Sequence, residues 1–430
     1  MAPAAVSLSI SIYEDKVRLV VLGKTGSFKQ TVEYTLNVTQ DDGGLRGADP
    51  YEVVYFVRTG MQTLLQSYKI WFHHIGIGVM PGYVMAWDKE SATPMGLCYL
   101  PHSVIPKEKY RAFKYSKFYD LLHESVTSGG NIDTAFNMWH VSQSLAKKTE
   151  SVCVSGIDTW LVYFLTGYSE DALVSHPSMF SGLLFDNEWD QPLIKVLGID
   201  LAYLPQLSNS VQLEIRHFTP CKDGIPIVYV ESTDQLVASM LQGYTDQPVA
   251  CLHVGHVNQL HVQQLGQNAL EGSSVHECIR FLGWDAFYKQ CLLQPLDGGL
   301  DVSMDDLTDA MAISLHPFRL FDVPQYHFMH ISDMASDTLY KLGVFQVLFL
   351  IKYCLASMER HGGHIQSLMV TGSQWHPSVV QLCVDLCQVS GLDFKWGHWL
   401  DHIHVCRGVT LMGFYSESVK ASLYKIQTHY

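Results

Sequence analysis

The chain has 430 residues, which is enough for two or three compact domains. Hydrophobic residues make up 47% of it, so we expect a packed globular protein rather than a disordered one. The formal net charge of −14 argues against nucleic acid and against an anionic membrane surface as the main partner.

The sequence also bears on the cellular compartment. No apolar run reaches the roughly 18 residues that span a bilayer, and the N-terminal stretch lacks the basic segment of a signal peptide. The ten cysteines are scattered along the chain rather than set in a dense framework. We therefore expect a cytoplasmic protein with reduced thiols and no membrane partner.

The first elements alternate apolar and polar residues. Residues 8–22 predict two strands joined by a tight turn at Tyr13-Glu14-Asp15, and residues 29–38 predict a further strand. A glycine-rich loop at 43–47 precedes a predicted helix over 50–68, and a short buried strand follows at 75–79. The order strand, strand, helix, strand is typical of a layered α/β domain.

The middle of the chain is less regular. Residues 94–106 are rich in proline and predict irregular structure, whereas residues 144–166 read as partly helical. Residues 160–165 are apolar on nearly every face, so we expect that helix to be buried.

A domain boundary is predicted near Gly224. The elements that follow are a strand, a helix with Ser232 or Thr233 as its N-cap, a hairpin, a long apolar helix, a strand and a helix, at 225–230, 232–241, 249–262, 339–358, 368–370 and 377–389. This order roughly repeats that of the first half. We therefore expect two similar α/β domains, 1–223 and 224–430, with a cleft between them.

Five segments carry a recognisable pattern in one consistent order. They are Gly156-Ile-Asp-Thr-Trp-Leu-Val-Tyr-Phe-Leu-Thr-Gly167, Phe185-Asp-Asn-Glu-Trp-Asp190, Leu197-Gly-Ile199 with Leu204-Pro205, Gly76-Ile-Gly-Val79 with Trp87, and Ser232-Thr-Asp-Gln-Leu-Val-Ala-Ser239. Together they resemble the FGGY family of carbohydrate kinases, and the sedoheptulokinase branch looks closest.

The resemblance implies a fold and a chemistry. It implies a two-domain, actin-like α/β ATPase fold of the ribonuclease-H type, with Mg-ATP as the cofactor of an active member. The family's general base, which deprotonates a sugar hydroxyl, corresponds to Asp234. An aspartate at the start of a helix is also stabilised by the helix dipole, so its presence fits a purely structural role equally well.

The first phosphate-binding hairpin departs from the family pattern D-x-G-T-T/S. Ser11 stands at the aspartate, Tyr13 at the glycine, and Glu14 and Asp15 at the hydroxyl positions. Tyrosine obstructs the close backbone approach that glycine allows, and two carboxylates repel a triphosphate. A bound Mg²⁺ would reverse the sign of that repulsion.

The other nucleotide motifs are altered as well. Gly255-His256-Val257 stands where the family has G-T-G or S-T-S, so one glycine remains without the hydroxyl pattern. In the adenine loop Gly372 and Ser373 remain, but Gln374 and Trp375 are bulky. Trp375 either stacks on a base or packs into an empty pocket, and we favour packing.

The substrate motifs are altered too. The W-Q-D-x-R pattern has no match beyond Trp87, and His176 replaces the acid of the substrate loop. Phosphate, adenine and sugar sites thus differ together, which indicates lost selection for phosphoryl transfer.

Histidine-rich stretches offer a different chemistry. His402 and His404 next to Cys406, and His253, His256 and His261, have residue types that bind metals. No C-x-x-C or H-E-x-x-H motif accompanies them, so we interpret them as ordinary histidines and expect no metal site.

Two functions remain open. The first is a catalytically inactive carbohydrate-kinase homologue with no cofactor, acting through a protein partner or a weak small-molecule ligand. The alternative is an active kinase that uses Mg-ATP to phosphorylate a sugar such as sedoheptulose, with Asp234 as the base.

Overall fold

The computed structural model describes residues 4–13, 15–22, 28–68, 70–101, 105–122, 132–145, 151–208, 213–215, 224–233, 249–254, 258–265, 274–280, 348, 352, 355, 367–372, 382–383 and 385–387. They fall into two compact units. The first holds every described residue up to Thr233, and the second holds every described residue from Val249 onward. None of the described helices is long and apolar enough to cross a membrane.

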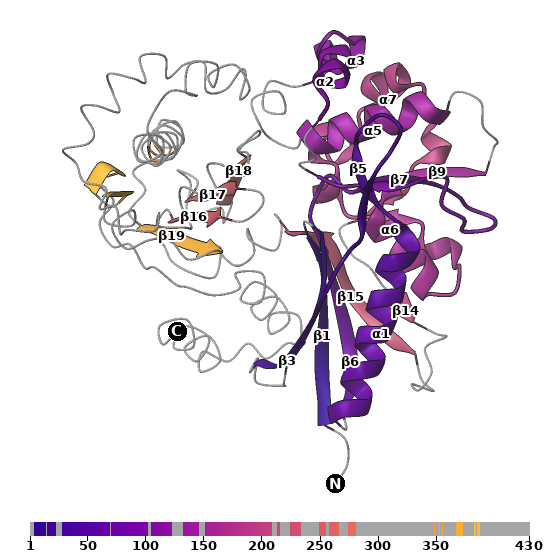
Figure 1. Cartoon of the computed structure of the whole chain (residues 1–430), viewed down its shortest axis with the longest axis vertical. Helices are drawn as coiled ribbons and strands as arrows, with labels where there is room; N and C mark the ends of the chain where they lie inside the picture. Colours follow the sequence, from indigo (N-terminus) through magenta and orange to yellow (C-terminus); the bar gives the residue numbers. More distant parts are fainter. Residues whose placement is uncertain are drawn as a thin grey trace. The chain divides into compact units, whose positions relative to one another are not determined.

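A mixed six-stranded sheet forms the centre of the first unit (Figure 1). Its strands, in spatial order, are β14 (Leu213–Ile215), β15 (Ile225–Ser232), β6 (Ile70–Val79), β1 (Ala4–Tyr13), β2 (Lys16–Leu22) and β3 (Phe28–Thr35). β1, β2 and β3 are antiparallel neighbours, while β6 runs parallel to both β1 and β15. The predicted hairpin around Tyr13 is confirmed.

The two faces of this sheet differ in chemistry. Even-numbered β1 residues, such as Ile10, lie on an apolar face with Leu19 of β2. Helix α1 (Pro50–Tyr68) packs on that face, because Gly60 of α1 approaches Leu19 closely, and α1 runs along the sheet (Figure 1). The opposite face carries Ser7, Ser9 and Ser11, which are all buried. β1 is therefore buried on both faces, at nearly every described position.

A second sheet in the first unit has five strands. In spatial order they are β4 (Val38–Gln40), β5 (Arg46–Ala48), β8 (Cys98–Tyr99), β7 (Val84–Asp88) and β9 (Val152–Gly156). Two short pairs accompany it: β10 (Val174–Ser175) with β13 (Gln206–Leu207), and β11 (Leu184–Phe185) with β12 (Glu188–Trp189).

The remaining helices of the first unit are short or amphipathic. They are α2 (Lys107–Lys114), α3 (Lys117–Leu121), α5 (Ile132–Leu145), α6 (Ile157–Leu165) and α7 (Gln191–Leu197), with 3-10 turns at Glu170–Ala172, Pro177–Met179, Ser181–Leu183 and Leu201–Tyr203. All of α6 except Phe164 is buried, which confirms the prediction for residues 160–165 apart from that side chain. Asp190 caps α7 by accepting from Leu193 N–H, and Gly198 ends it in the left-handed region.

The segment 144–166 is partly helical, as predicted, and a strand, β9, lies in it between α5 and α6. Two expectations differ from the structure. β5 begins at Arg46 inside the expected glycine-rich loop. β15 lies beyond the expected boundary at residues 223 and 224, yet it pairs with β6 in the first sheet. The first unit therefore extends past that boundary.

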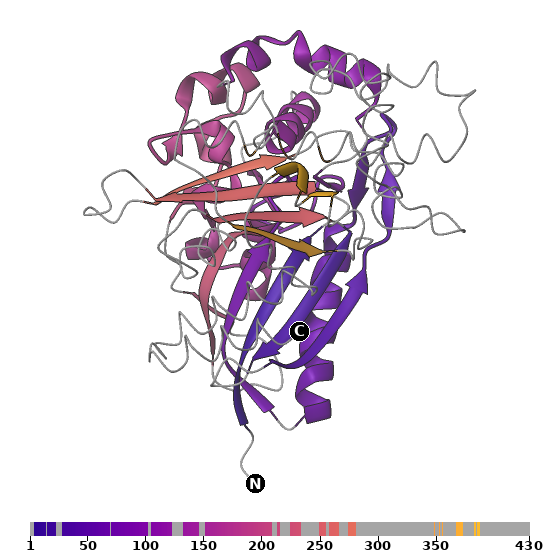
Figure 2. The ribbon, with the colours of Figure 1, turned by 90° about the vertical axis from the view of Figure 1, so that its left-hand side faces the viewer.

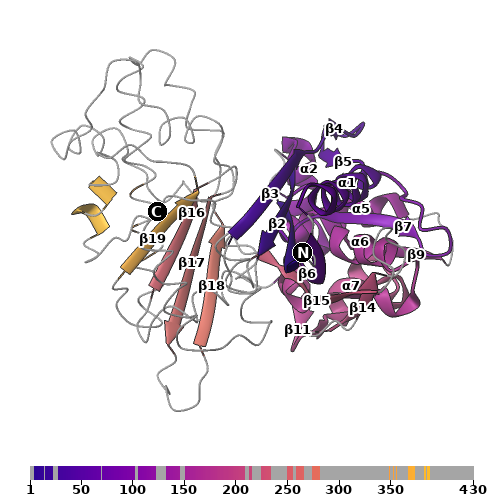
Figure 3. The same cartoon turned by 90° about the horizontal axis from the view of Figure 1, so that it is seen from below.

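The second unit contains a four-stranded sheet, seen as neighbouring strands in Figures 2 and 3. Its order is β18 (Ser274–Arg280), β17 (Asn258–Leu265), β16 (Val249–Val254) and β19 (Ser367–Gly372). β16 and β17 form the predicted hairpin, and β19 lies parallel to β16. Leu348, Lys352 and Leu355 are helical, as are Leu382, Cys383 and residues 385–387, which agrees with the two helices expected there.

Candidate functional site

The turn between β1 and β2 holds the candidate phosphate-site residues of the first hairpin. Ser11 pairs with Arg18 and Tyr13 pairs with Lys16 across the two antiparallel strands. Directly paired residues share a face of the sheet, so these four side chains belong to the polar face. Ser11 and Arg18 are buried there.

The carboxylate of Glu33, on β3, interacts with three side chains of this hairpin. Its Oε2 accepts a hydrogen bond of 2.9 Å from the Tyr13 hydroxyl, and its Oε1 accepts one of 2.9 Å from Lys16 Nζ. Arg18 Nε lies 3.5 Å from Oε2. Burial acts to raise the pKa of Glu33, but Lys16, Tyr13 and Arg18 together lower it below its usual value. We call Tyr13, Lys16, Arg18 and Glu33 the Glu33 cluster.

Asp15 adds a second carboxylate to the turn. Its backbone oxygen accepts a hydrogen bond of 2.7 Å from Leu36 N–H. Its side-chain Oδ1 is buried and has no hydrogen-bond partner within the described part of the chain. Glu14 lies outside the described residues.

Trp87, a candidate substrate residue, lies in the core of the first unit. Its ring is fully buried and packs against Tyr163, with 4.9 Å between ring centroids. Its indole N–H donates a hydrogen bond of 2.9 Å to the Ser155 hydroxyl. In this conformation the ring packs against protein groups on β9 and α6.

His176, the other candidate substrate residue, begins the 3-10 turn at Pro177–Met179. Its Nδ1 accepts a hydrogen bond of 3.1 Å from Ser178 N–H. A nitrogen that accepts in this way carries no proton, so the Ser178 hydroxyl, at 2.7 Å, also donates to it. The Ser178 oxygen in turn accepts from Ser232 N–H at 3.1 Å.

This series of bonds brings the candidate substrate loop to the end of β15. Ser232 is the last residue of that strand, and Asp234, the candidate base, lies two residues beyond it and outside the described residues. The candidate substrate loop thus lies beside the segment that leads to Asp234.

Asp158 of α6 is hydrogen-bonded to the start of the same loop. Its Oδ2 accepts a hydrogen bond of 2.5 Å from Ser175, the residue before His176, and both side chains are buried. Burial raises the pKa of Asp158 to about 6, although Ser175 and the first backbone N–H groups of α6 act in the opposite direction. This role is not predicted from the sequence, because no pattern marks Asp158 and Ser175 as neighbours.

The two candidate nucleotide loops begin at the same edge of the second sheet. Val254, the last residue of β16, lies directly opposite Gly372, the last residue of β19. Since the two strands are parallel, the chain leaves both at that edge. Gly255, His256 and Ser373 follow these strands and lie outside the described residues.

Histidine and cysteine residues give no metal centre in the described side chains. No group of three His, Cys, Asp or Glu residues there is arranged to hold a metal ion. Backbone register places His261 opposite Cys251, and His253 opposite Gln259. His402, His404 and Cys406 lie outside the described residues.

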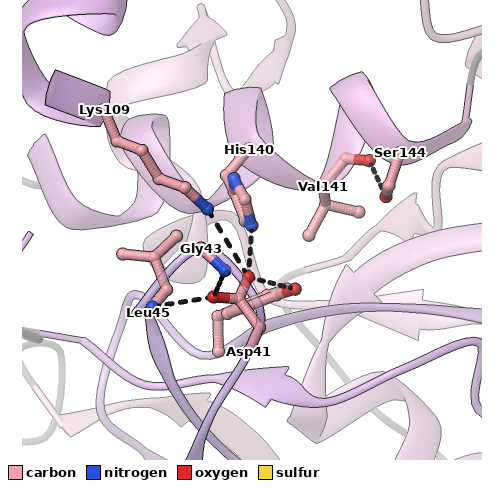
Figure 4. A network of polar contacts seen from close by, with 8 residues as sticks. Asp41, Gly43, Leu45, Lys109, His140, Val141 and Ser144 are labelled. Atoms are coloured by element: carbon pink, nitrogen blue, oxygen red, sulfur yellow. Dashed lines mark hydrogen bonds and ion pairs between the residues drawn. The ribbon is translucent and has the colours of Figure 1, made fainter. Parts of the chain in front are cut away.

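A further polar network joins α2, α5 and the loop before β5 (Figure 4). Asp41 Oδ1 accepts from the N–H groups of Gly43 and Leu45 at 2.9 and 2.8 Å, and Oδ2 lies 3.1 Å from His140 Nε2 and 3.6 Å from Lys109 Nζ. Burial acts to raise the pKa of Asp41, but Leu45 N–H, His140 and Lys109 lower it overall. The sequence predicts the turn but not these distant partners.

Known proteins resemble this chain in sequence over short segments. A glycerol kinase of Leptospira biflexa is 40% identical over 76 residues, which are 16% of this chain and 15% of that protein. A glycerol kinase of Listeria monocytogenes is 27% identical over 191 residues, or 41% of this chain and 37% of that protein. The chain therefore spans well under two thirds of these relatives. No family model matches it.

Solved structures resemble it over nearly its whole length. A glycerol kinase of Plasmodium falciparum with ADP superposes with a TM-score of 0.69 at 14% identity, covering 98% of this chain and 93% of that one. A ligand-bound xylulose kinase of Lactobacillus acidophilus gives 0.68 at 12% identity, covering 98% and 96%. The chain thus has the two-domain, actin-like α/β fold of these sugar kinases, as predicted. A special closeness to sedoheptulokinases stays a prediction.

Proposed function

We propose that this chain is a catalytically inactive carbohydrate-kinase homologue that acts by binding rather than by phosphoryl transfer. The observation that carries the proposal is the Glu33 cluster. Lys16 and Arg18 are the cations of β2 on the polar face, and both are paired with Glu33. Tyr13, where the family has glycine, is held in place by the same carboxylate.

The charges at this turn oppose a triphosphate. Glu33 offsets one of the two positive charges of Lys16 and Arg18. Glu14 and Asp15 add two negative charges at the hydroxyl positions of the family pattern, which leaves the turn with a net negative charge. Each close pair of like charges costs about 1 to 4 kcal/mol at effective dielectrics of about 80 to 20. Millimolar affinity corresponds to only about 4 kcal/mol, so repulsion at the upper end of this range would offset it for a nucleotide without bound Mg²⁺.

The two candidate substrate residues support the same interpretation. The Trp87 ring is fully buried, and the Nδ1 of His176 already accepts two hydrogen bonds from Ser178. Protein groups thus occupy the Trp87 ring, its N–H group and the Nδ1 of His176.

Calorimetry of Mg-ATP binding tests the proposal. We expect no heat of binding with the wild-type chain at millimolar nucleotide. The variant Tyr13→Gly with Glu14→Thr and Asp15→Thr restores the G-T-T part of the family hairpin and should bind measurably more tightly. Glu33→Gln, which releases Lys16 and Arg18, should act in the same direction, whereas Glu188→Gln, an exposed substitution on β12, should change nothing. Micromolar binding by the wild type would overturn the proposal.

The alternative is an active kinase with a remodelled nucleotide site. It is favoured by the bond between Ser232 N–H and Ser178, which brings the substrate loop to the segment that leads to Asp234. It requires Mg-ATP, with Asp234 taking the proton from a sugar or polyol hydroxyl.

A phosphorylation screen distinguishes the two functions. Glycerol, xylulose, gluconate and sedoheptulose are the substrates to test, the first three because they appear in the names of the similar kinases. ATP-dependent phosphorylation of any of them that disappears in Asp234→Asn would establish the alternative. Absence of turnover together with absence of a thermal shift by Mg-ATP would exclude it.

We also propose a cytoplasmic location and a protein partner or weak small-molecule ligand. The four cysteines whose side chains are described, Cys98, Cys153, Cys383 and Cys387, are all free thiols, which suits a reducing compartment. Proximity labelling in cells, followed by pull-down with the purified chain, would identify a partner.

A further inference from the structure

Two thiols of the second unit lie one helical turn apart and in contact. Cys383 and Cys387 are helical, and a hydrogen bond joins their thiols. The Cys383 side chain is fully buried beside Leu382 and Leu386, whereas Cys387 is partly exposed. One thiol of the pair is therefore accessible and the other is held directly behind it.

The surroundings favour the thiolate at Cys387. The hydrogen bond from Cys383 lowers the pKa of Cys387, burial opposes this change, and the charge of Lys352 supports it. Asp385, on the same helix, is the other charged group described in this segment. Cys383 shows the reverse, because its bond to Cys387 and its burial raise its pKa. Thiolates, rather than thiols, are the reactive form of cysteine.

We propose that Cys387 and Cys383 form an oxidisable dithiol, in which Cys387 is oxidised first and Cys383 then forms a disulfide with it. The oxidant is a hydroperoxide. Nothing in this proposal depends on whether the chain is an active kinase.

The chemistry proceeds in two balanced steps. The Cys387 thiolate attacks one peroxide oxygen, an S–O bond forms, the O–O bond breaks, and the departing alkoxide or hydroxide takes a proton from water. Sulfur is thereby oxidised by two electrons and the peroxide is reduced. The Cys383 thiol then attacks the Cys387 sulfur, forming the S–S bond, while the sulfenic oxygen leaves as water with the thiol proton.

The helix limits the second step. The Cα atoms of two residues that are four positions apart are separated by about 6 Å along a helix. This separation lies within the usual range of Cα separations for a disulfide, but the Cβ atoms must approach to about 4 Å. Closing the disulfide therefore distorts the helical turn between Leu382 and Cys387. Oxidation would thus change local structure as well as covalent state.

Mass spectrometry of the full chain tests the pair. Cleavage after Arg360 and Lys395 releases residues 361–395, which contain both thiols and no other cysteine. After hydrogen peroxide this peptide should lose two hydrogen atoms, a change distinct from the oxygen gained if Met369 is oxidised. With iodoacetamide at pH 7, Cys387 should react roughly tenfold faster or more than buried Cys98 and Cys153.

Variants separate the two roles. Cys383→Ser should prevent the disulfide and leave a sulfenic acid at Cys387 that dimedone traps, whereas Cys387→Ser should abolish both products. Lys352→Gln should slow alkylation, while Lys117→Gln, an exposed lysine on α3, should not. The proposal is overturned if Cys387 reacts no faster than Cys98 in the native chain. It is also overturned if peroxide leaves the native pair reduced while the denatured chain forms the disulfide.

Discussion

The carboxyl group of Asp158 accepts a hydrogen bond of 2.5 Å from the hydroxyl of Ser175, and both side chains are buried. The second oxygen, Oδ1, has no hydrogen-bond partner among the residues that the structure describes. Burial raises the pKa of Asp158 to about 6 from an ordinary value of 3.8. The folded chain therefore binds this proton more tightly than the unfolded chain does.

Replacing Asp158 by asparagine should remove one contribution to the pH dependence of stability. Because the folded pKa is raised, ionisation destabilises the fold, and this penalty grows from pH 3.8 to about pH 6. Two pKa units correspond to at most about 3 kcal/mol. Asp158→Asn should therefore raise the free energy of unfolding at pH 7 relative to wild type, by about 1 to 3 kcal/mol more than at pH 4.

Urea unfolding at the two pH values gives this difference directly. Asp186→Asn, an exposed substitution in the turn between β11 and β12, serves as the matched control and should show no such change. An equal effect of Asp158→Asn at both pH values would contradict the raised pKa.

His74 should give a pH dependence of opposite sign. Burial, and next the charge of His73, lower the pKa of His74 to about 4 from 6.5. The folded chain then resists protonation, so the stability that neutral His74 maintains above pH 6.5 is lost as the pH falls toward 4. The wild type should lose on the order of 1 kcal/mol more than His74→Gln over this range. Parallel unfolding curves for the two chains would refute it.

Gly76 should not tolerate a side chain. A Cβ atom there would lie 2.0 Å from the ring of Tyr229, which is buried and whose hydroxyl is 3.1 Å from Ser9 Oγ. Because the ring has no room to move, Gly76→Ala should cost about 1 to 3 kcal/mol of unfolding free energy. In a Tyr229→Val background the same substitution should cost much less, and a double-mutant cycle by thermal unfolding measures the difference.

Trp87 should behave as a core residue in stability measurements. Trp87→Phe removes the N–H that bonds to Ser155 and leaves space beside Tyr163, so we expect a loss of about 1 to 3 kcal/mol. Trp71→Phe, at a ring that is 43% exposed on β6, should change stability by less than about 0.5 kcal/mol. Equal effects of the two substitutions in chemical denaturation would show that Trp87 is not packed as described.

Local patterns predicted the elements that local interactions determine. The strands on either side of Tyr13 and the helix from Pro50 to Tyr68 were predicted from alternation and helical spacing, and the structure confirms both. β9 is not predicted, because Val152-Cys-Val154 is a short apolar run within a segment, 144–166, that reads as partly helical. Such runs do not distinguish a buried strand from a buried helix.

Non-local pairing explains what the sequence did not reveal. β15 was expected to start the second domain, but its partner β6 lies about 150 residues earlier, with Ile227 opposite Ile75. Glu33 was not singled out, since no motif marks a glutamate on β3 as the partner of Tyr13 and Lys16. The hairpin residues could be singled out from the sequence, whereas the tertiary contacts that hold them could not.

The Glu33 cluster has a consequence for how this chain can evolve. A change to glycine at position 13 would deprive Glu33 of a hydrogen-bond donor and leave a partly buried carboxylate with fewer partners. Removing Glu33 first would leave the buried Arg18 guanidinium without that counter-charge. Each single substitution in the cluster therefore weakens the fold, so these positions can change only through several coordinated substitutions.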